Sequence, residues 1–184
     1  MALLVTVVVL VVLGLALIVA YNKLVRLRQT VKESWSGIET ELNRRYDLIP
    51  NLVETVKGYA KHERETLDAV ISARNSAQSN LGSPEQLAKS EGQLNGAVRG
   101  LFALAESYPD LKANTNFLQL QGELAGTESR LASARQNYNN QVRELNTAVG
   151  SFPSALLAGP MGIKTEPYFE VENPQARQNV RVQF

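Results

Sequence analysis

Residues 1–20 read MALLVTVVVLVVLGLALIVA, and this stretch decides what kind of protein the chain can be. Only Thr6 and Gly14 interrupt its apolar side chains, and the first charged side chain is that of Lys23. A helix of about 20 apolar residues covers the ~30 Å hydrocarbon core of a bilayer. Lipid also forces the backbone to satisfy its own hydrogen bonds, which a helix does. We therefore expect Ala2–Ala20 to form one transmembrane helix.

A cleaved signal peptide is the competing interpretation of this stretch. Signal peptides carry basic residues before a shorter apolar segment and have small residues ahead of the cleavage site. No Lys or Arg precedes this segment, and Ile18-Val19-Ala20 ends it. A retained membrane anchor is therefore favoured.

The charges that flank the span predict its orientation. Basic side chains follow it at Lys23, Arg26, Arg28 and Lys32, and none precedes it. The positive-inside rule then places the N-terminus outside and residues 21–184 in the cytoplasm. Tyr21 lies where an aromatic side chain is expected at the membrane interface.

The composition of the whole chain excludes several classes of function. The formal net charge of +1 over 184 residues argues against a nucleic-acid-binding protein that works through a large basic field. The absence of cysteine excludes disulfides, thiol catalysis and thiolate metal sites.

After the span, apolar side chains recur every three or four residues from Leu24 to Val70, which is the pattern of an amphipathic helix. Pro50 interrupts the pattern but does not shift its phase. A proline inside a helix loses one hydrogen bond and crowds the carbonyl four residues earlier, here that of Tyr46. We predict one helix, kinked near Pro50, that ends at Ser79-Asn80-Leu81-Gly82.

Two further long helices and a short one are predicted. Ser83-Pro84-Glu85-Gln86 is typical of a helix start, with Ser at the N-cap and Pro at the first position. The helix that follows carries a heptad stripe with Glu91 as its polar member, and Pro109 stops it. A third helix begins near Asn114 or Thr115 and closes at Gly150 and Pro153, and Ser154–Ala158 could add a short capping helix.

Long amphipathic helices joined by short turns must bury their stripes against each other, and short links make neighbours antiparallel. The predicted fold is all-α: an N-terminal transmembrane helix and then an elongated antiparallel up-down bundle of three long helices plus a short one. The expected domains are a transmembrane anchor at 1–22, a cytoplasmic helical bundle at 23–158 and an extended C-terminal tail at 159–184. The heptad stripes resemble those of a coiled coil.

The predicted tail has β-like character. Residues 166–171 and 180–184 carry strand-forming side chains. Such a segment could fold back as a hairpin, add to another chain or lie along its own bundle. The sequence leaves open whether it pairs within or between chains.

Three glycines, Gly92, Gly96 and Gly100, step by four along one face of the second predicted helix. Small side chains permit close helix approach. We weigh two interpretations: tight packing within the bundle, and a contact face for a second subunit.

No residues predict a catalytic, cofactor or metal site, and we expect no enzyme. His62 is the only histidine, and neither Tyr59 nor Thr66 completes a helical metal site with it, so we place it on the surface. Arg44-Arg45 is the nearest thing to a basic patch, and its expected role is ion pairing with the neighbouring Glu39, Glu41 and Asp47. Asn137–Asn140 could cap or cross-link helices.

Several segments together resemble the LemA family. They are Arg45–Val53, Tyr108–Asn114 and Phe117–Gln121, then Glu128, Arg130, Ala134-Arg135, Tyr138-Asn139 and the stretch from Asn146 to Pro153. The resemblance extends over essentially the whole chain. It implies a bacterial inner-membrane protein with one N-terminal span and a cytoplasmic antiparallel helical bundle. It brings no catalytic residues, and some relatives are associated with specialised membrane structures.

Three functions follow as hypotheses. The first is a non-enzymatic, membrane-anchored scaffold that self-associates through its bundle and tail to organise a membrane region. The second is a membrane-tethered adaptor that recruits a partner protein to the bundle face. The third, an enzyme or small-molecule sensor, would need a polar convergent pocket that these stripes do not supply. The expected partners are the lipid bilayer, further copies of the chain and a possible protein partner, with no nucleic acid and no cofactor.

Overall fold

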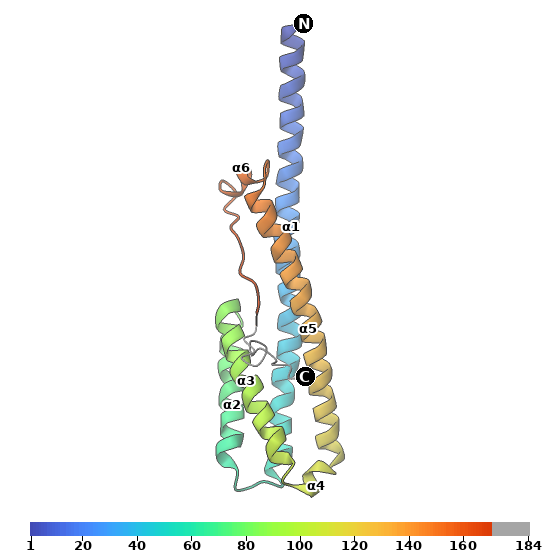
Figure 1. Ribbon diagram of the computed structural model, residues 1–184, viewed down its shortest axis with the longest axis vertical. Helices are drawn as coiled ribbons and strands as arrows, with labels where there is room; N and C mark the ends of the chain where they lie inside the picture. The colour runs from blue at the N-terminus through green and yellow to red at the C-terminus, as the bar shows by residue number, and fades with distance from the viewer. Residues whose placement is uncertain (171–184) are drawn as a thin grey trace, which may run out of the picture. The chain divides into compact units, whose positions relative to one another are not determined.

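The computed structural model describes residues 1–170, and every regular element in that range is a helix (Figure 1). The all-α prediction is therefore confirmed for the described chain. The helices are α1 (Ala2–Lys57), α2 (Arg64–Ser79), α3 (Pro84–Ala105), α4 (Pro109–Lys112), α5 (Thr115–Gly150) and α6 (Ala155–Ala158).

The chain divides into two compact units, and α1 and α5 each contribute residues to both. Among the described residues, the first unit comprises Met1–Ile38 and Ala134–Tyr168, and the second comprises Glu39–Ser133 together with Phe169 and Glu170.

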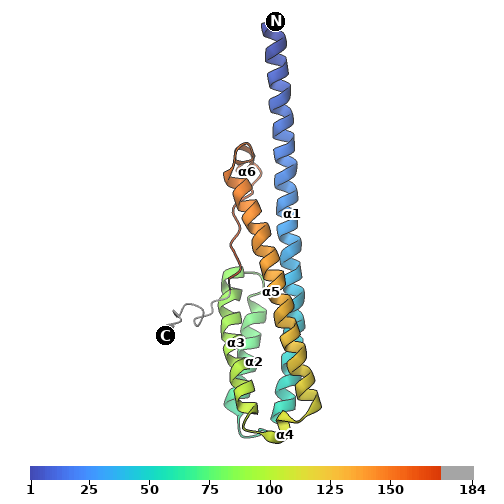
Figure 2. The same ribbon diagram turned by 45° about the vertical axis from the view of Figure 1, so that its right-hand side comes forward.

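The N-terminal part of α1 extends past α6 with no other element beside it (Figures 1 and 2). The predicted helix over Ala2–Ala20 is confirmed, and it is long and apolar enough to cross a membrane. None of its most apolar window is buried within the chain. Ala20, Leu24 and Leu27 are the first buried apolar residues along α1, so the core of the first unit begins where the apolar stretch ends.

In the second unit, α1 continues through Pro50 to Lys57. Pro50 has no N–H, so the carbonyl of Tyr46 lacks its usual donor from four residues ahead. The Nε–H of Arg74, on α2, donates to this oxygen at 3.2 Å instead. A side chain from the neighbouring helix thus supplies the hydrogen bond that the proline removes.

The prediction of a single helix from the span to residue 79 is wrong, because α1 ends at Lys57 and α2 begins at Arg64. Gly58 follows the last residue of α1, and the amides of Tyr59 and Ala60 both donate to the carbonyl of Val56 in the turn. The turn brings α2 back against α1, as the Arg74 hydrogen bond shows. Leu67 and Val70 are buried in this arrangement. A straight continuation would leave their stripe in water, so packing overrides the unbroken apolar phase.

The prediction for α3 is confirmed at its start and changed at its end. Ser83 lies at the N-cap in an extended conformation and Pro84 is the first helical residue, although the Ser83 side chain makes no capping hydrogen bond. The helix ends at Ala105, and Pro109 opens the short α4 after it. The predicted stripe is buried from Leu87 to Ala105, including Glu91. Figures 1 and 2 show α2 and α3 side by side.

The third predicted long helix is α5, which begins and ends where the sequence indicates, and α6 is the predicted short helix. Between them the Phe152-Pro153 peptide bond is cis. In the first unit the buried residues Tyr138, Val142 and Leu145 follow the predicted stripe of α5. The rings of Tyr138 and Trp35 on α1 meet edge to face, with 5.2 Å between their centroids.

The chain after α6 lies along α5 without forming a strand over residues 163–170 (Figure 2). The amide of Glu166 donates to Oδ1 of Asn146 at 2.8 Å, and Nδ2 of Asn146 donates to the carbonyl of Glu166 at 2.9 Å. Tyr138 Oη donates to the carbonyl of Pro167 at 3.0 Å. These bonds to α5 side chains replace the strand pairing predicted for the described part of 166–171. The second predicted strand, 180–184, lies outside the described residues.

Candidate functional site

A buried polar network in the second unit joins α1, α3 and α5. Its centre is Arg45, which is 5% exposed, and Glu91, which is 1% exposed. Nη1 of Arg45 donates to Oε2 of Glu91 at 2.8 Å and lies 3.1 Å from Oε2 of Glu128. Nη2 of Arg45 also donates to Oδ1 of Asn95. A buried charge is costly unless it is paired, and this guanidinium is paired on both of its terminal nitrogens.

Tyr46 completes the network from the other side of Glu91. Its hydroxyl donates to Oε1 of Glu91 at 2.8 Å. Burial, and then the neighbouring Glu91 carboxylate, raises the pKa of the Tyr46 hydroxyl above its ordinary value. The phenol therefore stays protonated and acts as a donor, so both oxygens of Glu91 are engaged. We interpret the network as structural, since its donors and acceptors are committed to one another.

The structure corrects the expected partners of Arg44-Arg45. Arg45 is ion-paired, but with Glu91 and Glu128 rather than with Glu39, Glu41 or Asp47. Glu41 instead pairs with Nε of Arg130 at 2.9 Å, and Asp47 is exposed. Residue 45 lies on the buried stripe of α1, so its side chain reaches neighbouring helices and not its own outer face. Glu91 at a buried heptad position was the signal that such a partner was needed.

The remaining sequence candidates lie on surfaces. His62 is exposed, as predicted. Within residues 1–170 no group of three His, Cys, Asp or Glu side chains is placed to hold a metal ion. Gly96 and Gly100 are exposed, and a Cβ at either would meet nothing within 4 Å. Tight packing within the chain is therefore wrong for these two glycines, because α3 packs through its Leu94 and Val98 side.

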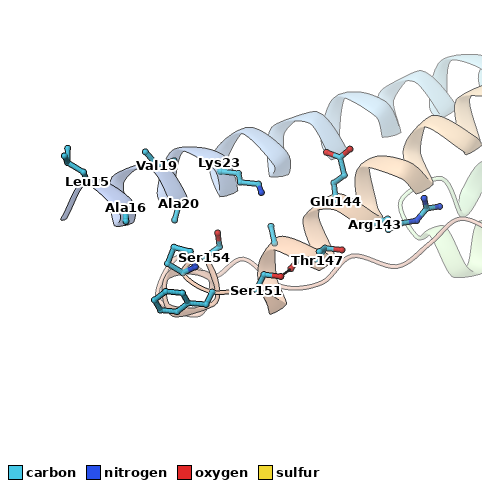
Figure 3. Close-up of a pocket in the computed structure, with 13 residues that line it drawn as sticks. Leu15, Ala16, Val19, Ala20, Lys23, Arg143, Glu144, Thr147, Ser151 and Ser154 are labelled. Atoms are coloured by element: carbon cyan, nitrogen blue, oxygen red, sulfur yellow. Dashed lines mark hydrogen bonds between the residues drawn. The ribbon is translucent and has the colours of Figure 1, made fainter. Parts of the chain in front are cut away.

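The first unit has a different candidate, an open apolar cavity of about 680 Å³ between α1 and the α5–α6 connection (Figure 3). On one side are Leu15, Ala16, Val19 and Ala20 from the apolar stretch of α1. On the other are Ala148 and the connection from Ser151 to Ser154. Its charged lining residues are Lys23, Arg143 and Glu144. Figure 3 shows Ser154 opposite Ala20 of α1 and Ser151 at the end of α5, where its hydroxyl donates to the carbonyl of Thr147 at 2.7 Å.

The lining of the cavity changes from apolar to charged side chains along its length, as the surroundings of a protein do at a membrane interface. Along α1 the lining changes from apolar at Leu15 to charged at Lys23. On the other wall it changes in the opposite chain direction, from Phe152 in the connection back to Arg143 on α5. Both walls are therefore apolar at one end and charged at the other. Sequence reasoning missed this site, because Phe152 and Leu15 are far apart in the chain and no local pattern indicates that they line the same cavity.

Comparison with known proteins gives a family match over most of the chain. The family model described as LemA family matches residues 34–184. The chain is 27% identical to "Protein LemA" of Metamycoplasma hominis, over 81% of this chain and 68% of that protein. It is 25% identical to "Magnetosome protein MamQ" of Magnetospirillum gryphiswaldense, over 83% of this chain and 65% of that protein. It is 26% identical to "Magnetosome protein MamQ 2" of Paramagnetospirillum magneticum, over 84% of this chain and 66% of that protein. The matched region thus spans about two thirds of these relatives.

Proposed function

The chain belongs to the LemA family, and from this premise we propose that it is a non-enzymatic, membrane-anchored scaffold that self-associates to organise a membrane region. The observation that carries the proposal is that the apolar N-terminal part of α1 is not covered by the rest of the described chain. Its apolar window is long enough to cross a bilayer, and none of it is covered by the rest of the chain. Burying each of these side chains in lipid is worth about 1.5–3 kcal/mol for a Val or Leu. A bilayer is therefore the natural environment of this segment.

The proposed location is the bacterial inner membrane, with the N-terminus outside and the helical bundle in the cytoplasm. The basic residues that follow the span support this orientation. Because the chain has no native cysteine, single thiols report topology directly. With a membrane-impermeant maleimide on intact cells, Ala2→Cys should be labelled and Ser76→Cys, on exposed α2, should not. Labelling of Ser76→Cys alone would reverse the proposed orientation.

A scaffold needs a rigid cytoplasmic part, and we propose that the helices after the span pack as an antiparallel bundle. The Arg45–Glu91–Glu128 network supports this, because it connects three helices of the second unit through hydrogen bonds. The absence of enzymatic activity is supported by the same network. The most buried carboxylate of residues 1–170, Glu91, is held by Arg45 and Tyr46, which leaves it unsuited to exchange protons with a substrate. The names of the related proteins likewise describe no enzyme.

Self-association is proposed to use the exposed glycine face of α3. Gly96 and Gly100 leave open space beside the helix, which would let a second copy approach closely. The names of two relatives as magnetosome proteins support a role in a specialised membrane structure.

The test is the mass of the detergent-solubilised full-length protein by light scattering at micromolar concentration. We expect an oligomer, and a monomer would overturn the proposal. Gly96→Leu with Gly100→Leu should dissociate the oligomer by filling the space. Gly122→Leu is the matched control, because it also adds a side chain where nothing lies within 4 Å but is on α5. Helical content should be retained in all variants, since Leu is a better helix former than Gly.

The second candidate is a membrane-tethered adaptor, with the bundle face or the tail as the docking surface for a partner protein. Deleting Tyr168–Phe184 discriminates between the two. Loss of the oligomer favours self-association through the tail. An oligomer that survives the deletion while a co-purifying partner is lost favours the adaptor.

A further inference from the structure

The connection between α5 and α6, together with α6 itself, presents two large apolar side chains to solvent. Phe152 is 78% exposed and Leu156 is 62% exposed. Fully burying such a side chain is worth about 1.5–3 kcal/mol, so a soluble protein would gain by covering them. Both belong to the first unit, which also contains the apolar stretch of α1.

The depth of this connection in a membrane follows from the helix that it faces. Phe152 shares a cavity with Leu15, Ala16 and Val19 of α1. The apolar stretch ends at Ala20 and the first charged side chain is that of Lys23, so the end of a membrane span lies near Tyr21. Leu15, Ala16 and Val19 precede this end by less than about two helical turns. The connection therefore lies beside the last turns of the span and not beyond them.

The charges around the cavity agree with this depth. Lys23 and Arg143 line its charged end, where lipid phosphates would lie, together with the carboxylate of Glu144. Two cations and one anion leave this rim with a net positive charge. Such a rim suits the anionic headgroups of a bilayer surface. The apolar end, with Phe152 and Val19, points to the acyl chains.

We propose that the α5–α6 connection and α6 form a second membrane contact, in which Phe152 and Leu156 insert into the interface of the leaflet where the span ends. Lipid acyl chains fill the open cavity between this connection and α1. The occupant is thus the bilayer, argued from the continuity of these side chains with the apolar stretch of α1. The inference rests on the proposed anchoring of α1 in the membrane.

Spin labels on single cysteines test this placement in the full-length protein. The chain has no native thiol, so Phe152→Cys, Leu156→Cys, Leu118→Cys and Val9→Cys can each be labelled uniquely. The labelled proteins are reconstituted into vesicles of phosphatidylcholine and phosphatidylglycerol. Accessibility is measured to oxygen, which partitions into lipid, and to a water-soluble nickel chelate. Leu118 is the matched control, because it is also an exposed apolar residue, on the part of α5 in the second unit.

We expect the labels at 152 and 156 to show a several-fold higher ratio of oxygen to chelate accessibility than the label at 118. A label at 152 that matches the one at 118 would overturn the inference. A label at 152 that is shielded from both reagents would also overturn it, because protein and not lipid would then cover the site. The label at 9 separates the two proposals. If it is in lipid while 152 is in water, only the second contact fails, and if 9 is in water, the anchor itself fails.

Discussion

The Nε–H of Arg74 donates to the carbonyl oxygen of Tyr46 at 3.2 Å, four residues before the proline that deprives this oxygen of its backbone donor. The proline and the arginine are on different helices of the second unit. Their relationship explains how α1 tolerates a residue that normally ends a helix. It also makes the contribution of Arg74 to stability depend on the identity of residue 50.

The first prediction is a coupling between these two positions. Pro50→Ala should stabilise the protein by about 1 kcal/mol or more, because it restores a backbone donor and removes a steric conflict. Arg74→Met should cost about 1 kcal/mol in the natural background, where it orphans the carbonyl. It should cost much less in the Pro50→Ala background. The double-mutant cycle compares the natural protein, the two single variants and the double variant by thermal or chemical unfolding in detergent. Strictly additive effects would contradict a hydrogen bond from Arg74 that depends on Pro50.

The second prediction concerns the buried ion pair. Glu91→Ala should lower the free energy of unfolding by about 3–5 kcal/mol, because it leaves the Arg45 guanidinium buried without its main partner. Glu54→Ala is the matched control, since Glu54 pairs with Lys57 at 3.0 Å on an exposed face of α1. Exposed pairs contribute little, so this variant should unfold nearly like the natural protein. Similar losses in both variants would show that the Arg45–Glu91 contact is not the source of the effect.

The third prediction is a loss of stability at alkaline pH that depends on Tyr138. Burial, followed by the nearby Glu166 carboxylate, raises the pKa of the Tyr138 hydroxyl from 10.0 to about 12. Above pH 10 the unfolded state releases this proton while the folded state keeps it. The stabilisation is therefore complete below the unfolded pKa and is lost as the pH rises from about 10 through about 12.

Tyr138→Phe should flatten the stability curve in that interval, although it also removes the hydrogen bond to Pro167. The check is the free energy of unfolding as a function of pH for both proteins. Spectrophotometric titration should show that the variant has lost a late-ionising tyrosine. Parallel curves over this interval would rule out the contribution of Tyr138.

The fourth prediction is that Asn146 holds the segment after α6 against α5. Asn146→Ala removes a donor and an acceptor for the backbone of Glu166. With about 1 kcal/mol for each bond, hydrogen exchange at the Glu166 amide should accelerate by about tenfold or more. Asn137→Ala, at an exposed position of the same helix, is the control. Unchanged exchange at Glu166 in Asn146→Ala would mean that other contacts hold the segment.

Local signals in the sequence were enough to predict most of the helices. The apolar stretch before Lys23, the Ser83-Pro84 start and the Gly150 end all act within a few residues of the feature that they determine. The turn after Lys57 was not predicted, because no local signal determines it. Ala60 and Leu67 are seven residues apart, which is two helical turns, so the apolar phase is the same on both sides of the break. Only the packing of α2 against α1 requires the chain to reverse there.

The candidate sites were less accessible to sequence reasoning, because they depend on contacts between distant residues. Arg45 and Glu91 are 46 positions apart, and local charge spacing pointed to the wrong partners for Arg45. Glu91 was recognised only as the polar member of an apolar stripe, and no partner was predicted for it. The strand predicted at 166–171 failed in its described part because side chains of α5 satisfy that backbone. Strand-forming residues favour an extended backbone, but they do not determine which groups hydrogen-bond to that backbone.

The hydrogen bonds between α5 and the segment after α6 determine which positions can be substituted without losing this attachment. The side-chain amide of Asn146 offers the same donor and acceptor as a peptide group, and it contacts only main-chain atoms of Glu166. Tyr138 likewise contacts the main-chain oxygen of Pro167. These hydrogen bonds therefore constrain the side chains at positions 138 and 146, but not those at positions 166 and 167. The replacement at position 166 that is incompatible with these hydrogen bonds is proline, because it would remove the N–H that donates to Oδ1 of Asn146.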